Sequence, residues 1–302
     1  MNKLTYIFSF FLLSISLYSC DLTQNIEVDL PEYESEIFVE SYLQPGLPFS
    51  VVMTRTVGYF DDLQLIYVED AVVSVTYNNQ TDTLTPLELP LNTPGLELLL
   101  DTALINSFRE FLGDAIYLYG SLTPVPTLYD SPFVLNVTTA DGVQLSATTI
   151  IPRPVEFEDP VIRFNDEERA LILTRFQDNA DTKDYYRRIL AVREQDIIEN
   201  EDGTVDTVWV SDEEQDFIVD DELTNGEIQV FGTTFDYSRG DTLIQTIYSV
   251  TGDYADFITT RDAAIGASLS PFGQPARLKS NIEGGQGIFT GQSRSELVTI
   301  IE

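Results

Sequence analysis

The stretch PFVLNVTTADGVQLSATTII, residues 132–151, decides the fold because two alternating segments meet at a tight turn. Apolar side chains occupy every second position on both sides of that turn: Phe133, Leu135, Val137, Val143, Leu145 and Ala147. Asp141 and Gly142 stand between the segments, and Asp-Gly favours the two-residue turn of a β-hairpin. The stretch therefore predicts two antiparallel strands that bury one face.

The same period of two recurs through the first half of the chain. Residues 37–42 and 71–78 alternate between two faces, and turns are indicated at 45–48 and 78–79. Short strands separated by turns are typical of an antiparallel sandwich. Residues 36–152 are therefore predicted to form an N-terminal β-sandwich domain of immunoglobulin or transthyretin type.

One segment of the first half has helical spacing. In LELLLDTALINSFREFLG, residues 96–113, apolar or small side chains recur at helical intervals: Leu100, Ala103, Leu104, Ser107, Phe108 and Phe111. Gly113 provides a stop signal. We expect a helix whose apolar face packs on the sandwich; a face that binds a membrane or a partner is the alternative.

Three prolines mark the predicted boundary to a C-terminal β-rich domain, residues 153–302: Pro152, Pro154 and Pro160. Strand patterns follow at 170–176, 185–199 and 204–211. Residues 253–267 instead have the spacing of a surface helix, with Tyr254, Phe257, Ile258 and Ile265 on one stripe. The expected fold class is mainly β, with two β-sandwich-like domains and one or two short helices.

The chain contains one cysteine, Cys20, at the end of an N-terminal apolar run. Lys3 precedes the run, which is too short for a comfortable transmembrane helix, so residues 1–19 are predicted to be a signal peptide. Leu17, Tyr18 and Ser19 before Cys20 resemble the lipobox of bacterial lipoproteins, in which the thiol is acylated. We therefore expect lipidation at Cys20, followed by a polar tether over residues 20–35. An ordinary signal peptide is the alternative.

The charge of the chain is strongly acidic, with 50 acidic and 16 basic side chains and a formal net charge of −34. Removal of residues 1–19 takes away Lys3 and no acid, so the mature charge would be −35. Phosphate binding requires basic patches, which excludes nucleic acid as a partner. Attachment to the bilayer is therefore expected through the acylated cysteine and not through basic side chains.

Several catalytic chemistries are excluded by composition. The chain has no histidine, and lipidation would consume its one thiol. Catalysis by Ser-His-Asp or Cys-His groups and zinc sites with His or Cys ligands are therefore impossible. A carboxylate pair of the glycosidase type remains, but 50 acids place some pair at a suitable distance by chance. We predict no catalytic, cofactor-binding or metal-binding residues.

An acidic run at 211–222 raises the question of calcium. Its carboxylates are Asp212, Glu213, Glu214, Asp216, Asp220, Asp221 and Glu222. Calcium takes six to eight oxygen ligands, but this spacing matches no known calcium loop. A solvated, self-repelling loop is therefore expected, and calcium is the alternative.

The tail ARLKSNIEGGQGIFTGQSRSE, residues 276–296, is rich in glycine. Glycines free the backbone to adopt positive φ or to approach another surface closely. The tail is interpreted as a bulged terminal strand that closes the second sheet, and a loop pressed against a partner is the alternative.

The tail also carries a family resemblance. Together with FVESYLQPGLPFSVVMTRTVGYFD, AVVSVTY, the 132–151 hairpin and DYYRR, it resembles the Bacteroidota lipoprotein family named domain of unknown function 4249 (DUF4249). The family motif, which we interpret as structural, is Ser280, Asn281, Ile282, Gly284, Gly285 and Gly287. The resemblance implies an outer-membrane lipoprotein of two β-rich domains, with some members acting as accessory partners of TonB-dependent transporters. No catalytic residues are assigned to the family.

The expected function is that of a lipid-anchored outer-membrane binding or accessory protein on the cell-surface side. Its expected partners are the bilayer, through Cys20, and a TonB-dependent outer-membrane β-barrel. A carboxylate-dependent glycan hydrolase is one alternative. An accessory subunit of the outer-membrane assembly or secretion machinery is another.

Overall fold

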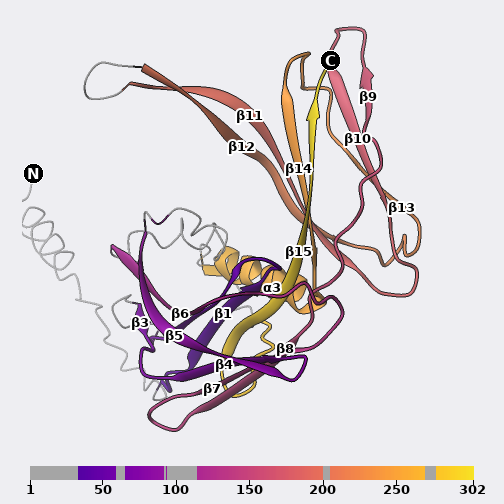
Figure 1. The fold of residues 1–302 in the computed structure, drawn as a ribbon. Helices are drawn as coiled ribbons and strands as arrows, with labels where there is room; N and C mark the ends of the chain where they lie inside the picture. Colours follow the sequence, from indigo (N-terminus) through magenta and orange to yellow (C-terminus); the bar gives the residue numbers. More distant parts are fainter. Residues whose placement is uncertain (1–32, 59–64, 92, 94–113, 200–204, 269–276) are drawn as a thin grey trace, which may run out of the picture. The chain divides into compact units, whose positions relative to one another are not determined.

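The structure, a computed structural model, describes residues 33–58, 65–91, 93, 114–199, 205–268 and 277–302. Two sheets account for most of these residues, so the predicted mainly β, sandwich-like fold class is confirmed (Figure 1). The predicted helix at 96–113 and the lipidation site at Cys20 lie outside the described residues. No helix within the described ranges is long and apolar enough to cross a bilayer.

The larger sheet has twelve strands. Their order is β12 (Val205–Asp220), β11 (Tyr185–Glu199), β14 (Thr242–Val250), β15 (Gln286–Ile300), β1 (Ile37–Leu43), β2 (Pro48–Arg55), β6 (Ala115–Pro124), β5 (Gln80–Pro90), β4 (Val72–Tyr77), β7 (Phe133–Thr138) and β8 (Gln144–Thr149), with β3 (Ile66–Tyr67) paired to β2. The smaller sheet has the order β13 (Ile228–Gly232), β10 (Ala170–Gln177) and β9 (Val161–Phe164).

The hairpin at 132–151 is confirmed, but its turn has three residues and not two, because the Thr139 N–H donates to the Val143 carbonyl oxygen across Ala140, Asp141 and Gly142. β7 and β8 pair antiparallel from Phe133 opposite Thr149 to Thr138 opposite Gln144. Gly142 has a φ of +88° in the turn, a conformation that glycine adopts without steric cost. The alternating apolar side chains lie in one core cluster, where the rings of Phe49, Tyr77 and Phe133 pack in a row with centroid distances of 5.6 and 5.3 Å.

β15 joins the two halves of the chain. Its first part pairs parallel with β1, from Gln286 opposite Phe38 to Gly291 opposite Leu43. Its second part pairs antiparallel with β14, up to Ile300 opposite Thr242. As expected for a terminal strand that closes the second sheet, residues 292–300 pair with β14 alone among the described strands, whereas residues 286–291 pair with β1 and connect that sheet to the first half. Within Ser35–Glu302, which form one compact unit, the predicted boundary at 152–153 falls between β8 and β9.

The C-terminal half is a sandwich of the small sheet on β11 and β14. Phe176, Tyr186, Phe231 and Ile247 form a buried cluster between them. The buried guanidinium of Arg188 lies between the rings of Phe217 and Phe231, 5.6 Å from each centroid.

The helix predicted at 253–267 is confirmed as α3, Gly252–Ser268. Thr251 caps it, because its hydroxyl accepts the Tyr254 N–H at 3.2 Å. Tyr254 and Phe257 are buried in a cluster with Tyr42 and Ile288, whereas Ile265 at the far end is 48% exposed.

Candidate functional site

The family motif docks the start of β15 onto the rest of the sheet. Asn281 bonds both backbone groups of Phe289: its Nδ2 donates to the carbonyl oxygen at 2.8 Å, and its Oδ1 accepts the N–H at 3.0 Å. The next residues pair with β8, since the N–H groups of Glu283 and Ser146 each donate to the other residue's carbonyl oxygen. Ser280 accepts the N–H of Ile282, whose side chain lies in the N-terminal core.

The motif glycines lie where no side chain fits. A Cβ on Gly287, which has a φ of +114°, would lie 1.9 Å from the carbonyl oxygen of Val39. A Cβ on Gly284 would lie 2.4 Å from the Gln144 oxygen, and one on Gly285 would lie 2.7 Å from the Ile37 oxygen. Close packing within the chain is sufficient to require these glycines.

The acidic run at 211–222 is not the solvated loop that its charge predicts, because residues 211–220 continue strand β12. This strand is paired along its length with β11. Arg187 of β11 forms a bidentate ion pair with Asp216 of β12. The pairing has a register shift between Leu190 and Ala191, opposite Gln215 and Glu213.

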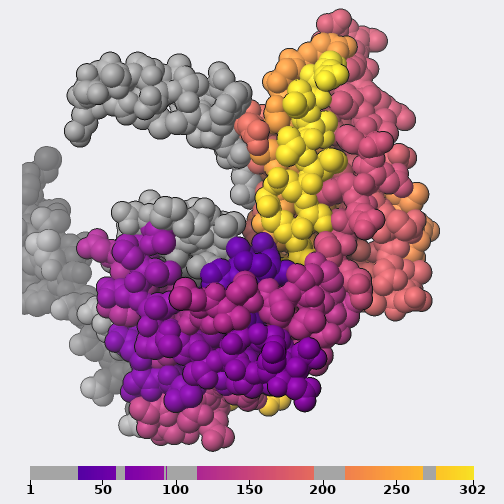
Figure 2. All heavy atoms as spheres, in the orientation of Figure 1, coloured from indigo at the N-terminus to yellow at the C-terminus, as the bar shows by residue number. Residues whose placement is uncertain are grey.

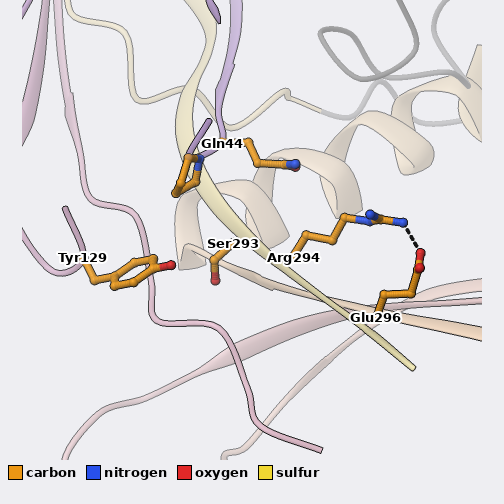
Figure 3. A pocket seen from close by; sticks show the side chains of 6 residues that line it. Gln44, Tyr129, Ser293, Arg294 and Glu296 are labelled. Atoms are coloured by element: carbon orange, nitrogen blue, oxygen red, sulfur yellow. Dashed lines mark hydrogen bonds and ion pairs between the residues drawn. The ribbon is translucent and has the colours of Figure 1, made fainter. Parts of the chain in front are cut away.

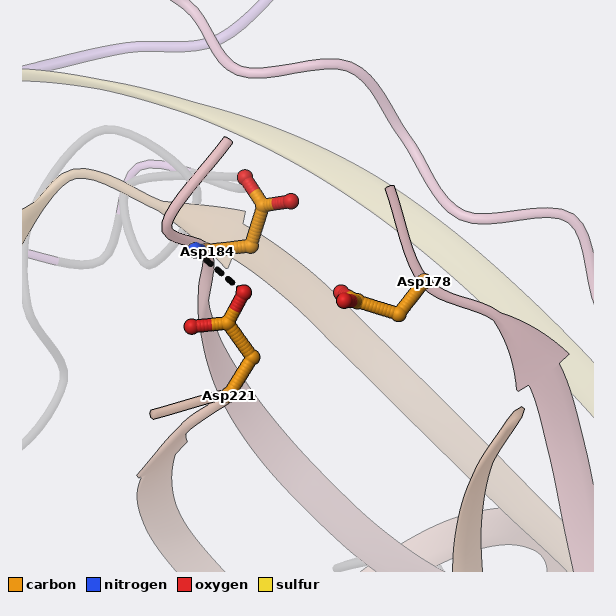
Figure 4. A group of neighbouring side chains, drawn as sticks. All are labelled: Asp178, Asp184 and Asp221. Carbon is orange, nitrogen blue, oxygen red and sulfur yellow. Dashed lines mark hydrogen bonds between the residues drawn. The ribbon is translucent and has the colours of Figure 1, made fainter. Parts of the chain in front are cut away.

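Asp221, directly after β12, meets two acids that the sequence analysis did not single out. One carboxylate oxygen from each of Asp178, Asp184 and Asp221 lies within 4.8 Å of the others (Figure 4). Asp178 follows β10 and Asp184 precedes β11, so the ends of three strands bring the cluster together. The three acids come from separate segments of the chain, and no local sequence motif predicts that they meet.

Hydrogen bonds fix two members of this cluster. The Tyr186 hydroxyl and the Gly226 N–H donate to the two oxygens of Asp178, and the Asp184 N–H donates to Asp221 at 3.0 Å. Burial raises the pKa of the Tyr186 hydroxyl, and the Asp178 carboxylate adds to that shift. Four of the six carboxylate oxygens accept protein donors, whereas Asp221 Oδ1 is buried and has no hydrogen-bond partner among the described residues. Three carboxylates by themselves offer fewer than the six to eight ligands that calcium takes.

Asp184 is the partly exposed member of the cluster, whereas the other two acids are buried. Burial, followed by the charges of Asp178, Asp221 and Asp130, raises the pKa of the Asp184 carboxyl group, although the Thr182 hydroxyl donates to it at 2.8 Å. Asp184 alone among the three acids lines a groove of about 930 Å³.

The walls of this groove come from three segments, at 148–158, 177–186 and 249–256, together with Asp130. The first follows β8, the second connects β10 to β11, and the third includes the first turn of α3. The volume falls within the range of small-molecule sites. None of these segments carried a ligand-binding motif, so the groove could not be found from the sequence.

A smaller pocket of about 260 Å³ lies near the middle of β15 (Figure 3). Gln44, Tyr129 and Ser293 line it together with the ion pair between Arg294 and Glu296. Ser293 is buried, and its hydroxyl has no hydrogen-bond partner among the described residues. It lies directly opposite Ser249, a residue of the large groove, across the β14–β15 ladder.

Comparison with known proteins gives a family but no activity. No curated protein matches the chain. A crystal structure of a point mutant of Salmonella alpha-2-macroglobulin matches with 10% identity over 94% of this chain and 16% of that one, at a TM-score of 0.22, which is too low to support an argument. Residues 23–297 match the family described as a domain of unknown function, DUF4249. Since that match covers most of the chain, the protein belongs to the DUF4249 family.

Proposed function

We propose that the protein is a lipid-anchored outer-membrane accessory protein that partners a TonB-dependent transporter in nutrient uptake. The anchor is the acylated Cys20, supported by the lipobox-like Leu17-Tyr18-Ser19 before it. The compact unit begins at Ser35, and the 14 intervening residues (21–34) can span at most about 50 Å. The proposal places this unit on the cell-surface side of a Bacteroidota outer membrane.

The accessory role depends on one observation, the outward face of the small sheet. Residues opposite one another in the β9–β10 and β10–β13 ladders share this face. It carries five aliphatic side chains and two arginines: Val161, Leu171, Leu173, Ile228, Val230, Arg163 and Arg175. None of the three strands contains an acidic residue.

The composition of the chain predicts an acidic surface, whereas the strands of this face carry aliphatic and basic side chains. In a protein with 50 acids, an acid-free sheet with Ile228 and Val230 about half exposed is suited to an apolar partner surface. Figure 2 shows the rose-coloured atoms of β9 and β10 at the surface beside those of β15, in yellow. Arg175 is already paired with Glu158 at 3.1 Å, so the partner surface would be apolar with an acidic group near Arg163.

Affinity purification from detergent-solubilised outer membranes tests the proposal, with a C-terminal tag and mass spectrometry of the recovered proteins. The expected result is stoichiometric recovery of one TonB-dependent barrel and acyl chains on Cys20. Cys20→Ser should release the protein from the membrane, because acylation supplies the anchor.

Val230→Asp should remove the barrel while the protein stays in the membrane. Leu122→Asp is the matched control, because Leu122 is 98% exposed on β6, outside the small sheet. Recovery of the lipoprotein alone from wild-type membranes would contradict the partnership. Equal loss of the barrel in both variants would contradict the assignment to this face.

A carboxylate-dependent glycan hydrolase is the second candidate. The observation that favours it is the raised pKa of Asp184 at the wall of a large groove, since a general acid needs such a shift. Release of reducing sugar from a panel of glycans, lost in Asp184→Asn, would support this candidate. An inactive wild-type protein on that panel would count against it.

A further inference from the structure

The groove that contains Asp184 has an excess of negative charge. Six carboxylates line it: Asp130, Glu156, Glu158, Asp184, Asp253 and Asp256. The two bases in its walls already have acidic partners. Arg153 pairs with Asp130 at 2.7 Å, and Lys183 pairs with Glu222 at 3.4 Å. Two more of these carboxylates pair with bases outside the lining, Glu158 with Arg175 at 3.1 Å and Asp256 with Lys279 at 3.9 Å. Glu156, Asp184 and Asp253 remain as groove carboxylates that form no ion pair with a described residue.

A buried hydroxyl in the same groove has no partner. Ser249 is 4% exposed, and its Oγ forms no hydrogen bond with any described residue. It lies on β14 opposite Tyr186 of β11, and both residues line the groove. An unpaired buried hydroxyl is costly, so this atom is an available hydrogen-bonding group for a ligand.

Part of the remaining wall is apolar. Pro152, Pro154 and Val155 line it along the segment after β8, and Tyr185 and Tyr186 line it from the start of β11. Proline, valine and tyrosine surfaces suit an alkyl chain, while the polar groups fix its charged end. The Ser295 hydroxyl donates to the carbonyl oxygen of Val155 at 2.7 Å, which ties this wall to β15.

We propose that this groove binds a cationic ligand, an ammonium or guanidinium group on an apolar stem, with Asp184 and Ser249 at its charged end. Such a group can be a free amine or the side chain of a lysine or arginine in a peptide. The assignment depends neither on the lipid anchor nor on the partner barrel, so it can fail while the proposed accessory function stands.

Electrostatics favours a cation over other ligands. Three carboxylates within 4.8 Å repel one another, and a cation beside Asp184 would offset that repulsion. An anion would meet the three groove carboxylates that have no base partner among the described residues, Glu156, Asp184 and Asp253. A bound cation should lower the pKa of Asp184 from its raised position, because an opposite charge favours the ionised form.

Isothermal titration calorimetry on the full chain in detergent tests the proposal with two cationic probes. One is 1,5-diaminopentane, a free amine, and the other is the capped peptide Ac-Ala-Lys-Ala-NH2. The same peptide acetylated on the lysine Nζ is the neutral control and should not bind. The tighter of the two cationic probes identifies the source of the ligand.

Two variants locate the site. Asp184→Asn should weaken binding about tenfold or more, since it removes a charge-assisted hydrogen bond. Ser249→Leu should also weaken binding, because it fills the base of the groove. Glu167→Gln is the control, because it makes the same change in net charge at an exposed residue outside the groove.

The proposal is overturned if neither cationic probe binds. It is also overturned if Glu167→Gln weakens binding as much as Asp184→Asn, because that result indicates diffuse attraction to an acidic surface. Wild-type affinity in either groove variant overturns it as well. Circular dichroism and the urea midpoint of each variant establish that the variants are folded.

Discussion

Gly287 illustrates how a single residue is constrained by its neighbours in space. Its φ of +114° is disfavoured for L side chains, and a Cβ would lie 1.9 Å from the Val39 oxygen. Both constraints arise because β15 begins its parallel pairing with β1 at this point. The glycine therefore permits the contact that holds the two strands together.

Gly287→Ala should lower the free energy of unfolding by about 4 kcal/mol or prevent folding, because it combines backbone strain with a steric clash. Urea unfolding followed by circular dichroism measures the change. Gly46→Ala is the control, since Gly46 has a φ of +86° but no atom lies within 4 Å of the position that a Cβ would take. It should cost only about 1 kcal/mol, and an equal loss in both variants would contradict the clash.

Tyr77 is a residue whose burial has a consequence for pH. Burial, with a further contribution from the hydrogen bond to Asp82, raises the pKa of Tyr77 to about 12. The unfolded chain ionises this hydroxyl near pH 10, whereas the folded chain keeps the proton. The resulting stability is fully present below pH 10 and is lost as the pH rises toward 12.

The free energy of unfolding should therefore fall between pH 10 and 12, and it should fall less steeply in Tyr77→Phe. Urea titrations across this pH range, with tyrosinate absorbance as a second signal, measure both slopes. Tyr33→Phe is the control because Tyr33 is 53% exposed. The same slope in wild type and Tyr77→Phe would show that Tyr77 does not contribute.

At the scale of elements, the start of β15 depends on a side chain that acts as a strand partner. Asn281 satisfies both backbone groups of Phe289, a residue with no exposed surface. It also donates to Asp253 in the first turn of α3 at 3.3 Å. One amide therefore links the strand to the helix.

Asn281→Ala should lower the free energy of unfolding by about 3 kcal/mol, because it leaves a buried N–H and a buried carbonyl without partners. Thermal and urea unfolding measure the loss. Asn179→Ala is the control, since Asn179 is exposed and its amide nitrogen donates to the Thr182 hydroxyl in the same loop. A cost under about 1 kcal/mol in Asn281→Ala would contradict the role of this amide.

At the scale of the whole molecule, β15 couples the two halves of Ser35–Glu302. It pairs with β1 of the first half and β14 of the second, and its Gly291 N–H donates to the Thr149 hydroxyl at the end of β8. Loss of β15 would therefore expose two new strand edges, one in each half.

Phe289→Ala should lower the stability of both halves by about 3–5 kcal/mol, because it leaves a cavity at a fully buried position. Hydrogen exchange followed by mass spectrometry in increasing urea should give the same midpoint for peptides from β4 and β14. Separate midpoints, with only one of them shifted by the substitution, would show that the halves unfold independently.

The sequence by itself determined the local features of this protein: the mainly β class, the 132–151 hairpin, α3 and the DUF4249 motif. The first three depend on periodicity or turn chemistry in short segments, and the motif depends on the identity of neighbouring residues, so the chain order records all four directly. The tertiary structure decided what depends on distant segments. It placed β15 inside the larger sheet, extended the acidic run of β12 by pairing it with β11, and gathered Asp178, Asp184 and Asp221 at the ends of three strands. Their contact, and the groove beside them, arise from pairing between residues far apart in sequence, which leaves no periodic signal in the chain.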